Sequence, residues 1–143
     1  MIKNILFICT GNSARSIIAE AIVNKQYKDK FKAYSAGSNP SEKINSDVKK
    51  YLESKNYNLS NYKSKNFDIF LDNSIKMNFV ITVCNAANKE ICPIWANRNQ
   101  IIHWDIEDPV QKLNQTNDEN QKKIISEKTF NKINLRIKDL FKI

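Results

Sequence analysis

Apolar residues along the chain follow two patterns: short continuous runs, and longer stretches in which they recur at helical spacing. Residues 3–8 form an apolar run without alternation, which predicts a strand of a parallel sheet covered on both faces. We expect three further strands, at residues 31–35, 78–83 and 100–104. The stretches between and after these strands carry the helical pattern.

Helical spacing predicts three main helices. They are expected at residues 15 or 16 to about 28, 46–55 and about 118–140. A short helical segment is expected at residues 67–71, whereas residues 56–65 are polar and indicate a loop. Asp108 and Pro109 are expected to close another loop.

Strands that alternate with helices predict an α/β fold with a four-stranded, doubly wound parallel sheet and helices on both faces. In such sheets the ligand crevice lies beyond the carboxyl ends of the strands. Four residues with chemical potential are expected to end or follow the four strands: Cys9, Ser35, Cys84 and Asp108. The sequence therefore predicts that all four lie at the same edge of the sheet.

Length and composition fit a single domain, residues 1–143, because 41% of the 143 residues are apolar, enough for one core. No apolar run approaches the ~18–20 residues that cross a bilayer. We therefore expect a cytoplasmic protein without membrane contact, and nothing in the chain demands more than a monomer. The net charge of +8 comes from scattered lysines. That scatter indicates a solvated basic surface or attraction of an anion, and not a nucleic-acid binder.

The three cysteines are Cys9, Cys84 and Cys92. Their odd number argues against a disulfide framework, and no C-x-x-C pair is present. Together with His103 they could supply zinc ligands, but their spacing is wrong for the common structural sites. We therefore expect no metal site among them.

The segment from Cys9 to Ser16 places a cysteine and Arg15 at the two ends of a predicted strand–helix loop. Such a loop can turn its N–H groups inward as an anion-binding nest, to which the helix N-terminus adds positive charge. Gly11 allows backbone geometry that a side chain would block, and Arg15 can bind two oxygens of a tetrahedral anion. The hydroxyl of Ser13 or Ser16 can donate to the sulfur. The predicted oxyanion-binding residues are Thr10, Gly11, Asn12, Ser13, Ala14, Arg15 and Ser16.

These donors would also stabilise Cys9 as a nucleophilic thiolate. The alternative interpretation is a plain strand–helix turn that contains a buried cysteine. The strand before the pattern, the helix after it and the serine after Arg15 make the anion-binding interpretation the more specific one.

Together with Ser35-Ala36-Gly37 and Asp108-Pro109, this loop resembles the low-molecular-weight protein tyrosine phosphatase superfamily over essentially the whole chain. Residues 80–84, 92–95 and 103–109 make the chain more similar to the thioredoxin-coupled arsenate reductases of that superfamily. The resemblance implies a three-layer sandwich around a four-stranded parallel sheet. It also implies that Asn12, Ser16 and Ser35 support the loop.

The resemblance implies catalytic roles for Cys9, Arg15, Cys84, Cys92 and Asp108. Cys9 would attack arsenate, the loop with Arg15 would stabilise the oxyanion, and Asp108 would protonate the leaving oxygen. Cys84 would then attack Cys9 and release arsenite, Cys92 would attack Cys84, and thioredoxin or glutaredoxin would reduce the final disulfide. No cofactor is expected.

Two alternatives stay open. One is a phosphatase that hydrolyses phosphomonoesters through a phosphocysteine at Cys9, with Cys84 as core packing and Cys92 as an incidental thiol. Against it, Val110 and Gln111 follow Pro109, where phosphotyrosine enzymes of this group commonly carry aromatic residues. The other is a catalytically idle module that binds anions or senses redox state.

Some features depart from the family pattern. Ala14 stands where some relatives have a cysteine, which leaves the three-thiol relay intact. Some reductases of this type bind potassium through groups that match Asn12, Glu20, Ser35 and an aspartate, and Lys65 stands at the aspartate position. Either the lysine ammonium replaces the metal charge or the site is absent. We therefore predict no strong potassium dependence.

The one histidine and the two tryptophans are expected to have packing roles more than chemical ones. His103 is expected to be a packed, hydrogen-bonded residue at a strand end. Trp95 and Trp104 are expected to cover the pocket or pack in the core, and not to bind a cofactor.

Overall fold

The computed structural model describes residues 1–70, 75–83 and 101–142. Within them a parallel sheet has the strand order β2-β1-β3-β4. The strands are β1 (Lys3–Cys9), β2 (Phe31–Gly37), β3 (Phe79–Thr82) and β4 (Ile101–His103). The predicted α/β fold with a four-stranded parallel sheet is therefore confirmed. One boundary differs, since Ser35 lies inside β2 and not at its end.

The helices also lie close to their predicted positions. They are α1 (Arg15–Gln26), α2 (Ser46–Ser54), the 3-10 turn η1 (Phe67–Phe70) and α4 (Glu119–Phe141). A further helix, α3 (Pro109–Asn114), was not predicted and begins where the expected loop closes at Asp108 and Pro109. It forms because the Asp108 carboxylate accepts a hydrogen bond from Val110 N at 3.0 Å, and because proline suits the first helical position.

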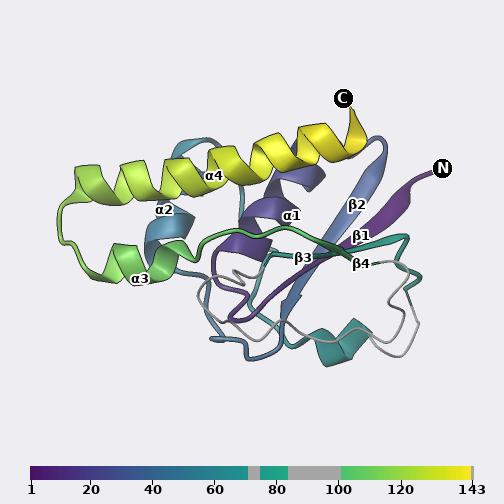
Figure 1. Ribbon diagram of the computed structural model, residues 1–143, viewed down its shortest axis with the longest axis horizontal. Coiled ribbons are helices and arrows are strands. Elements are labelled where there is room, and N and C mark those ends of the chain that lie inside the picture. Colours follow the sequence, from purple (N-terminus) through teal and green to yellow (C-terminus); the bar gives the residue numbers. More distant parts are fainter. Residues whose placement is uncertain (71–74, 84–100, 143) are drawn as a thin grey trace.

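The sheet is covered differently on its two faces (Figure 1). On one face, Ile5 and Phe7 of β1 pack into a large core with apolar residues of α1, α2 and α4. On the other face, Leu6 and Ile8 pack with Phe70 of η1 and with neighbouring apolar residues. Because β1 is central and buried on both faces, its unbroken apolar run is explained.

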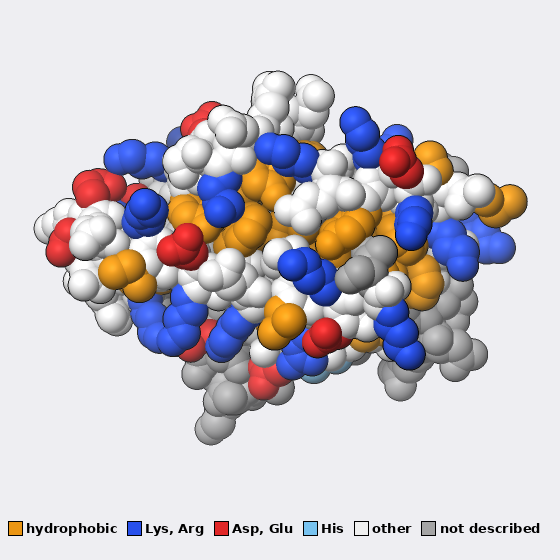
Figure 2. Space-filling view, turned by 90° about the horizontal axis from the view of Figure 1, so that it is seen from above, with side chains coloured by type: hydrophobic (Ala, Val, Ile, Leu, Met, Phe, Trp, Pro, Cys, Tyr) orange, Lys and Arg blue, Asp and Glu red, His pale blue; other side chains and the backbone are white. Residues whose placement is uncertain are grey.

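The long helix α4 lies across α1 and α2 on the larger core (Figure 1). Phe130, Ile133 and Ile137 face that core and are almost completely buried. Each such side chain contributes about 1.5–3 kcal/mol when it is removed from water. The outer face carries lysines and arginine interspersed with acidic side chains (Figure 2). None of the helices in the described ranges is both long and apolar enough to span a bilayer.

Candidate active site

The loop between β1 and α1 is held from outside by the segment that follows β2. Four of its carbonyl oxygens accept backbone hydrogen bonds at 2.9–3.2 Å, and they belong to Cys9, Thr10, Gly11 and Ser13. The donors are the N–H groups of Ser38, Asn39, Ser41 and Asn45. Since the N–H of a peptide unit points opposite to its C=O, this outer attachment directs the loop amides to the other side.

The helix that follows the loop begins without a side-chain cap. Ala14 occupies the capping position and makes no side-chain hydrogen bond, and no acidic residue lies in the first turn of α1. The first N–H groups of α1 and its positive dipole end therefore face the loop, and the first turn of α1 itself carries no acidic residue that would offset this charge. This arrangement suits an anionic ligand.

The sulfur of Cys9 lies inside this loop and is almost fully buried, with 2% of the residue exposed. It accepts a hydrogen bond from Asn12 N at 3.0 Å and lies 2.9 Å from Ser16 Oγ. Of the two serines considered from the sequence, Ser16 is thus the one at the sulfur. The amide hydrogen of Asn12 is therefore aimed at the sulfur, and Ser16 Oγ is close enough to share a hydrogen bond with it.

The strained backbone position of the loop is Asn12 and not Gly11. Asn12 has φ 48°, whereas no glycine of the described chain has a positive φ. A Cβ on Gly11 would meet Ser13 Oγ at 3.6 Å, an ordinary contact. The expectation that Gly11 supplies the special geometry is therefore wrong. Asparagine tolerates the left-handed region better than most residues do, which explains why it carries the turn.

The glycine that the loop does require is Gly37, at the end of β2. A Cβ there would lie 2.5 Å from the carbonyl oxygen of Thr10 and 3.1 Å from Asn12 N. Such a contact with backbone has no flexible side chain to move aside. Gly37 therefore allows β2 and the loop to approach each other closely.

Arg15 connects the loop to the chain before α3. Its guanidinium, in a residue with 2% exposure, donates to the carbonyl oxygen of Ile106 at 2.9 Å and lies 3.7 Å from Asp108 Oδ2. The side chain of Asp108 is 40% exposed, so this carboxyl group reaches solvent beside the loop. The structure thus brings Cys9, Arg15 and Asp108 to one edge of the sheet.

The three residues expected to support the loop form one buried network. The side-chain amide of Asn12 donates to Ser16 Oγ at 2.7 Å and to Ser35 Oγ at 3.0 Å. Its Oδ1 accepts from Lys65 N at 2.8 Å. Asn12 and Ser35 have no exposed surface. Because Ser16 also contacts the sulfur of Cys9, this network fixes the position of the nucleophile.

A buried carboxylate ends the network. Ser35 Oγ donates to Glu20 Oε1 at 2.5 Å, and Glu20 is only 5% exposed. Burial raises the pKa of Glu20, while the positive charge of Lys65 and the hydrogen bond from Ser35 oppose that shift. Burial likewise lowers the pKa of Lys65, and the negative charge of Glu20 opposes it.

Sequence reasoning named Lys65 only for its side chain, and it missed the contributions of Ser64, of the Lys65 main chain and of residue 106. Ser64 Oγ donates to the carbonyl oxygen of Gly11 at 3.0 Å, and the amide of Lys65 binds Asn12. Residues 56–65 gave only a polar-loop signal, which does not indicate where a loop lies. The carbonyl of Ile106 is a main-chain group and has no sequence signal at all.

Two of the expected thiols, Cys84 and Cys92, lie outside the described residues, as does Trp95. Val83, the residue before Cys84, is described, and its N–H donates to the carbonyl oxygen of Ile8 at 2.8 Å. The expectation that the strand before Cys84 neighbours β1 is confirmed by the pairing of β3 with β1.

Of the remaining candidates, Trp104 packs in the core, whereas His103 is exposed, so the expectation that His103 is packed is wrong and only its hydrogen bond is confirmed. His103 Nδ1 lies 2.7 Å from Thr82 Oγ1, a contact that joins β4 to β3. Trp104 is 4% exposed, and its ring lies 5.9 Å from that of Phe7 in the core. Among the described residues, no group of three His, Cys, Asp or Glu side chains is placed to hold a metal ion.

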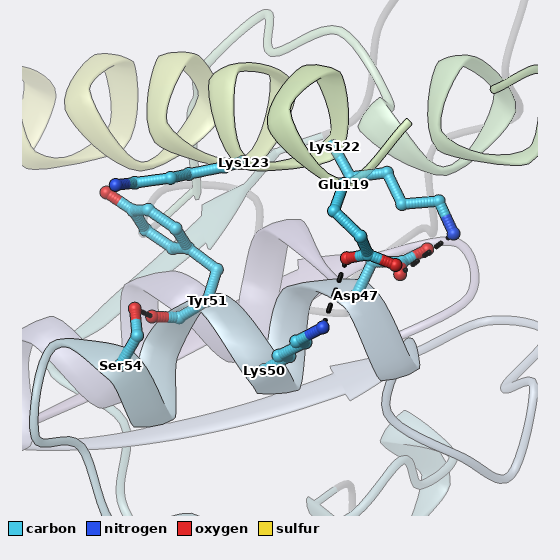
Figure 3. Close-up of a pocket in the computed structure, with 7 residues that line it drawn as sticks. All are labelled: Asp47, Lys50, Tyr51, Ser54, Glu119, Lys122 and Lys123. Atoms are coloured by element: carbon cyan, nitrogen blue, oxygen red, sulfur yellow. Dashed lines mark hydrogen bonds and ion pairs between the residues drawn. The ribbon is translucent and has the colours of Figure 1, made fainter. Parts of the chain in front are cut away.

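Two of the hollows that the described residues line lie outside the loop. The larger, of about 270 Å³, lies between α2 and α4 and is crossed by ion pairs from Lys50 to Glu119 at 3.1 Å and from Lys122 to Asp47 at 3.3 Å (Figure 3). None of the predicted site residues lines it. The smaller, of about 160 Å³, lies between residues 106–112 and α4, with Asp108 in its wall.

Comparisons with known proteins agree with this geometry. The family model described as low molecular weight phosphotyrosine protein phosphatase matches residues 4–142. An arsenate reductase of Bacillus cereus strain 03BB102 is 34% identical over 110 residues, which cover 77% of this chain and 79% of that protein.

Two solved structures are similar over most of this chain. The arsenate reductase from Archaeoglobus fulgidus superposes with a TM-score of 0.69 at 28% identity, over 90% of this chain and 94% of that one. The thioredoxin-dependent arsenate reductase of Corynebacterium glutamicum gives a TM-score of 0.62 at 22% identity, over 96% of this chain and 61% of that one. The latter likeness concerns the fold alone.

Proposed function

Since the chain belongs to the low molecular weight phosphotyrosine protein phosphatase family, we propose that it is an arsenate reductase of that family, with thioredoxin as reductant. The observation that carries this proposal is the convergence on one loop of a buried, doubly hydrogen-bonded cysteine sulfur, the N-terminus of α1, Arg15 and Asp108. Relatives that share about a third of the sequence are arsenate reductases, which favours arsenate over other tetrahedral oxyanions.

The first step is a substitution at arsenic. The thiolate of Cys9 attacks arsenate, an S–As bond forms, and the opposite As–O bond breaks. The loop amides and the guanidinium of Arg15 stabilise the charge on the remaining oxygens. Asp108 gives its proton to the departing hydroxyl group of arsenate, which leaves as water. The carbonyl of Ile106 favours this step indirectly, because it holds the guanidinium beside both the loop and Asp108.

The second stage transfers two electrons. The thiolate of Cys84 attacks the sulfur of Cys9, the S–As bond breaks, and its electron pair stays on arsenic, which leaves as arsenite. Cys92 then attacks Cys84, so that Cys9 is released as a thiolate and a Cys84–Cys92 disulfide remains. A thioredoxin dithiol, or alternatively a glutaredoxin thiol system, reduces this disulfide. The thioredoxin dependence named for the Corynebacterium glutamicum protein supports this choice of reductant.

A second candidate function is hydrolysis of phosphomonoesters, because the same loop and Asp108 serve phosphorus as well as arsenic. The residues after Pro109 argue against a large aromatic substrate. Val110 is half-buried against the core and Gln111 is polar and exposed. We therefore expect at most weak phosphatase activity on small substrates.

Further properties are part of the same proposal. We propose that residues 1–143 form a single domain, because β1, α1 and α4 share one core. We propose a cytoplasmic monomer that binds arsenate or phosphate and no nucleic acid. The basic residues spread over the α4 face without forming a block support that last point (Figure 2).

The test is arsenate turnover coupled through thioredoxin and thioredoxin reductase to the oxidation of NADPH, with p-nitrophenyl phosphate cleavage measured in parallel. Cys9→Ser should abolish both activities. Cys84→Ser and Cys92→Ser should each stop repeated turnover and leave the weak phosphatase activity. Mass mapping after a single arsenate turnover should find the Cys84–Cys92 disulfide.

Other outcomes decide between the alternatives. Brisk p-nitrophenyl phosphate cleavage without arsenate turnover would favour the phosphatase, and neither activity would favour an anion-binding module. A Cys92→Ser variant with the full thioredoxin-coupled rate would refute the relay as written. Arg15→Lys should strongly weaken anion binding, because an ammonium cannot replace a bidentate guanidinium.

A further inference from the structure

The smaller of the two hollows lies next to the anion-binding loop but is separate from it. It measures about 160 Å³ and lies between α4 and the segment that leads from β4 into α3 (Figure 1). None of the loop residues 9–16 lines it. Ile106 borders both places, since its carbonyl oxygen accepts from Arg15 and the residue also lines the hollow. A molecule in this hollow would therefore leave the loop free for an oxyanion.

Apolar residues form the wall of this hollow on both sides. Ile106 and Pro109 contribute from the segment before α3 and from its first residue, and Ile124 and Ile125 contribute from α4. Ile124 is 50% exposed, which leaves a large apolar side chain in contact with water. An apolar ligand that covers it would remove this surface from water, which is favourable.

The same hollow has an excess of positive charge. Its charged residues are Glu107, Asp108, Lys112, Lys128 and Lys132. Both acids already have a cation, because Glu107 pairs with Lys112 at 3.1 Å and Asp108 lies 3.7 Å from the guanidinium of Arg15. Lys128 and Lys132 stand one turn apart on α4, are exposed, and form no ion pair with any residue that the structure describes. Two ammonium groups at the hollow are thus left for a ligand.

The size and the lining together indicate the chemistry of the ligand. A volume of about 160 Å³ is smaller than the ~300–1,000 Å³ of pockets for drug-sized molecules, so the ligand must be small. The apolar wall favours a hydrocarbon body, and the two ammonium groups favour a negative head group. An inorganic anion would leave the apolar wall in contact with water, and a neutral hydrocarbon would leave the lysines without a partner.

We propose that this hollow binds a small amphipathic carboxylate, with its hydrocarbon chain against Ile124 and Pro109 and its carboxylate between Lys128 and Lys132. The ligand would contact both α4 and the segment whose Ile106 carbonyl holds Arg15. Its binding would therefore stabilise that segment in its present position. The site is distinct from the oxyanion loop, so the proposal does not depend on which reaction the loop performs.

The experiment is an NMR titration of the full-length chain with hexanoate, in which the backbone amide signals are followed. Saturable shifts should centre on Asp108, Ile125 and Thr129. Acetate, which lacks the hydrocarbon chain, and 1-hexanol, which lacks the charge, should both bind much more weakly than hexanoate. Inorganic phosphate should move the signals of residues 9–16 and leave the dissociation constant of hexanoate unchanged.

Variants of exposed lysines test the charge. Lys128→Gln combined with Lys132→Gln should weaken hexanoate binding by about fivefold or more, since two surface charge contacts are lost. Lys123→Gln combined with Lys138→Gln removes two exposed lysines of the same helix that do not line the hollow, so this control should bind like the wild type. Hexanoate should raise the thermal midpoint of the wild type and of the control more than that of the first pair.

A second pair of variants tests the apolar wall. Ile124→Ser should weaken hexanoate binding, whereas Leu135→Ser, at a 60% exposed position of α4 outside the hollow, should not. Shifts confined to residues 9–16, equal binding of acetate or 1-hexanol, or wild-type affinity in the Lys128→Gln and Lys132→Gln variant would each overturn the proposal. None of these measurements uses turnover, so they stand even if the proposed reductase activity fails.

Discussion

Replacement of Asn12 tests whether the network under the loop positions the nucleophile. Asn12→Gly removes the side chain and keeps a residue that adopts positive φ without strain. Asn12→Ala removes the same hydrogen bonds and adds strain, because alanine must adopt the φ of 48°. The pair of variants therefore separates the contribution of the hydrogen bonds from that of the backbone conformation.

The magnitudes follow from the contacts. The side chain makes hydrogen bonds of 2.7, 3.0 and 2.8 Å in a residue with no exposed surface. At about 1 kcal/mol for each bond, Asn12→Gly should lower the free energy of unfolding by about 3 kcal/mol. The left-handed conformation adds about 1 kcal/mol for Asn12→Ala, so this variant should lose about 4 kcal/mol.

Urea denaturation of both variants measures these free energies, and alkylation of Cys9 reports the state of the sulfur. Both variants should alkylate more slowly than wild type, because Ser16 loses the donor that orients it toward the sulfur. The reasoning fails if Asn12→Gly is as stable as wild type. It fails equally if Asn12→Ala proves more stable than Asn12→Gly.

Three other changes have defined outcomes. Gly37→Ala should cost about 1–3 kcal/mol in urea denaturation, because its Cβ meets Thr10 O at 2.5 Å, while Gly11→Ala should be nearly neutral. Asp108→Asn should keep the α3 cap but lower p-nitrophenyl phosphate turnover by about 10²–10⁴-fold, and an unchanged rate would exclude proton transfer by Asp108. Burial raises the pKa of Tyr51 to about 12. The neutral phenol therefore makes its full contribution to the free energy of unfolding below pH ~10, and this contribution is lost as pH rises through about 12. Tyr51→Phe should flatten the fall of the free energy of unfolding across that range.

The elements were predictable where the signal was local. The apolar run of β1 and the helical spacing of α4 reflect burial of the residues themselves, and both elements lie within a few residues of their expected bounds. The helix α3 was missed although its start was visible. Asp108 followed by Pro109 fits a turn and a capped helix equally well, and six residues give too little periodicity to decide.

The same difference between local and long-range signals applies to the residues of the site. The spacing from Cys9 to Arg15 is local, so the sequence indicated the anion-binding loop directly. The contacts from Lys65 to Asn12 and from Ile106 to Arg15 join residues 53 and 91 positions apart. Only the fold brings such groups together, and one of each pair is a main-chain atom with no sequence signature. The geometry of Gly11 was misassigned because glycine permits unusual dihedrals without requiring them.

The hydrogen bond from Arg15 to the carbonyl oxygen of Ile106 constrains the number of residues between β4 and α3 more than the type of side chain at position 106. Any apolar side chain that fills the space of Ile106 presents the same carbonyl to the guanidinium. An inserted or deleted residue between β4 and α3 would instead move that carbonyl and Asp108 together. Exchanges of one apolar side chain for another at position 106 should therefore be tolerated far better than changes in the number of residues in this connection.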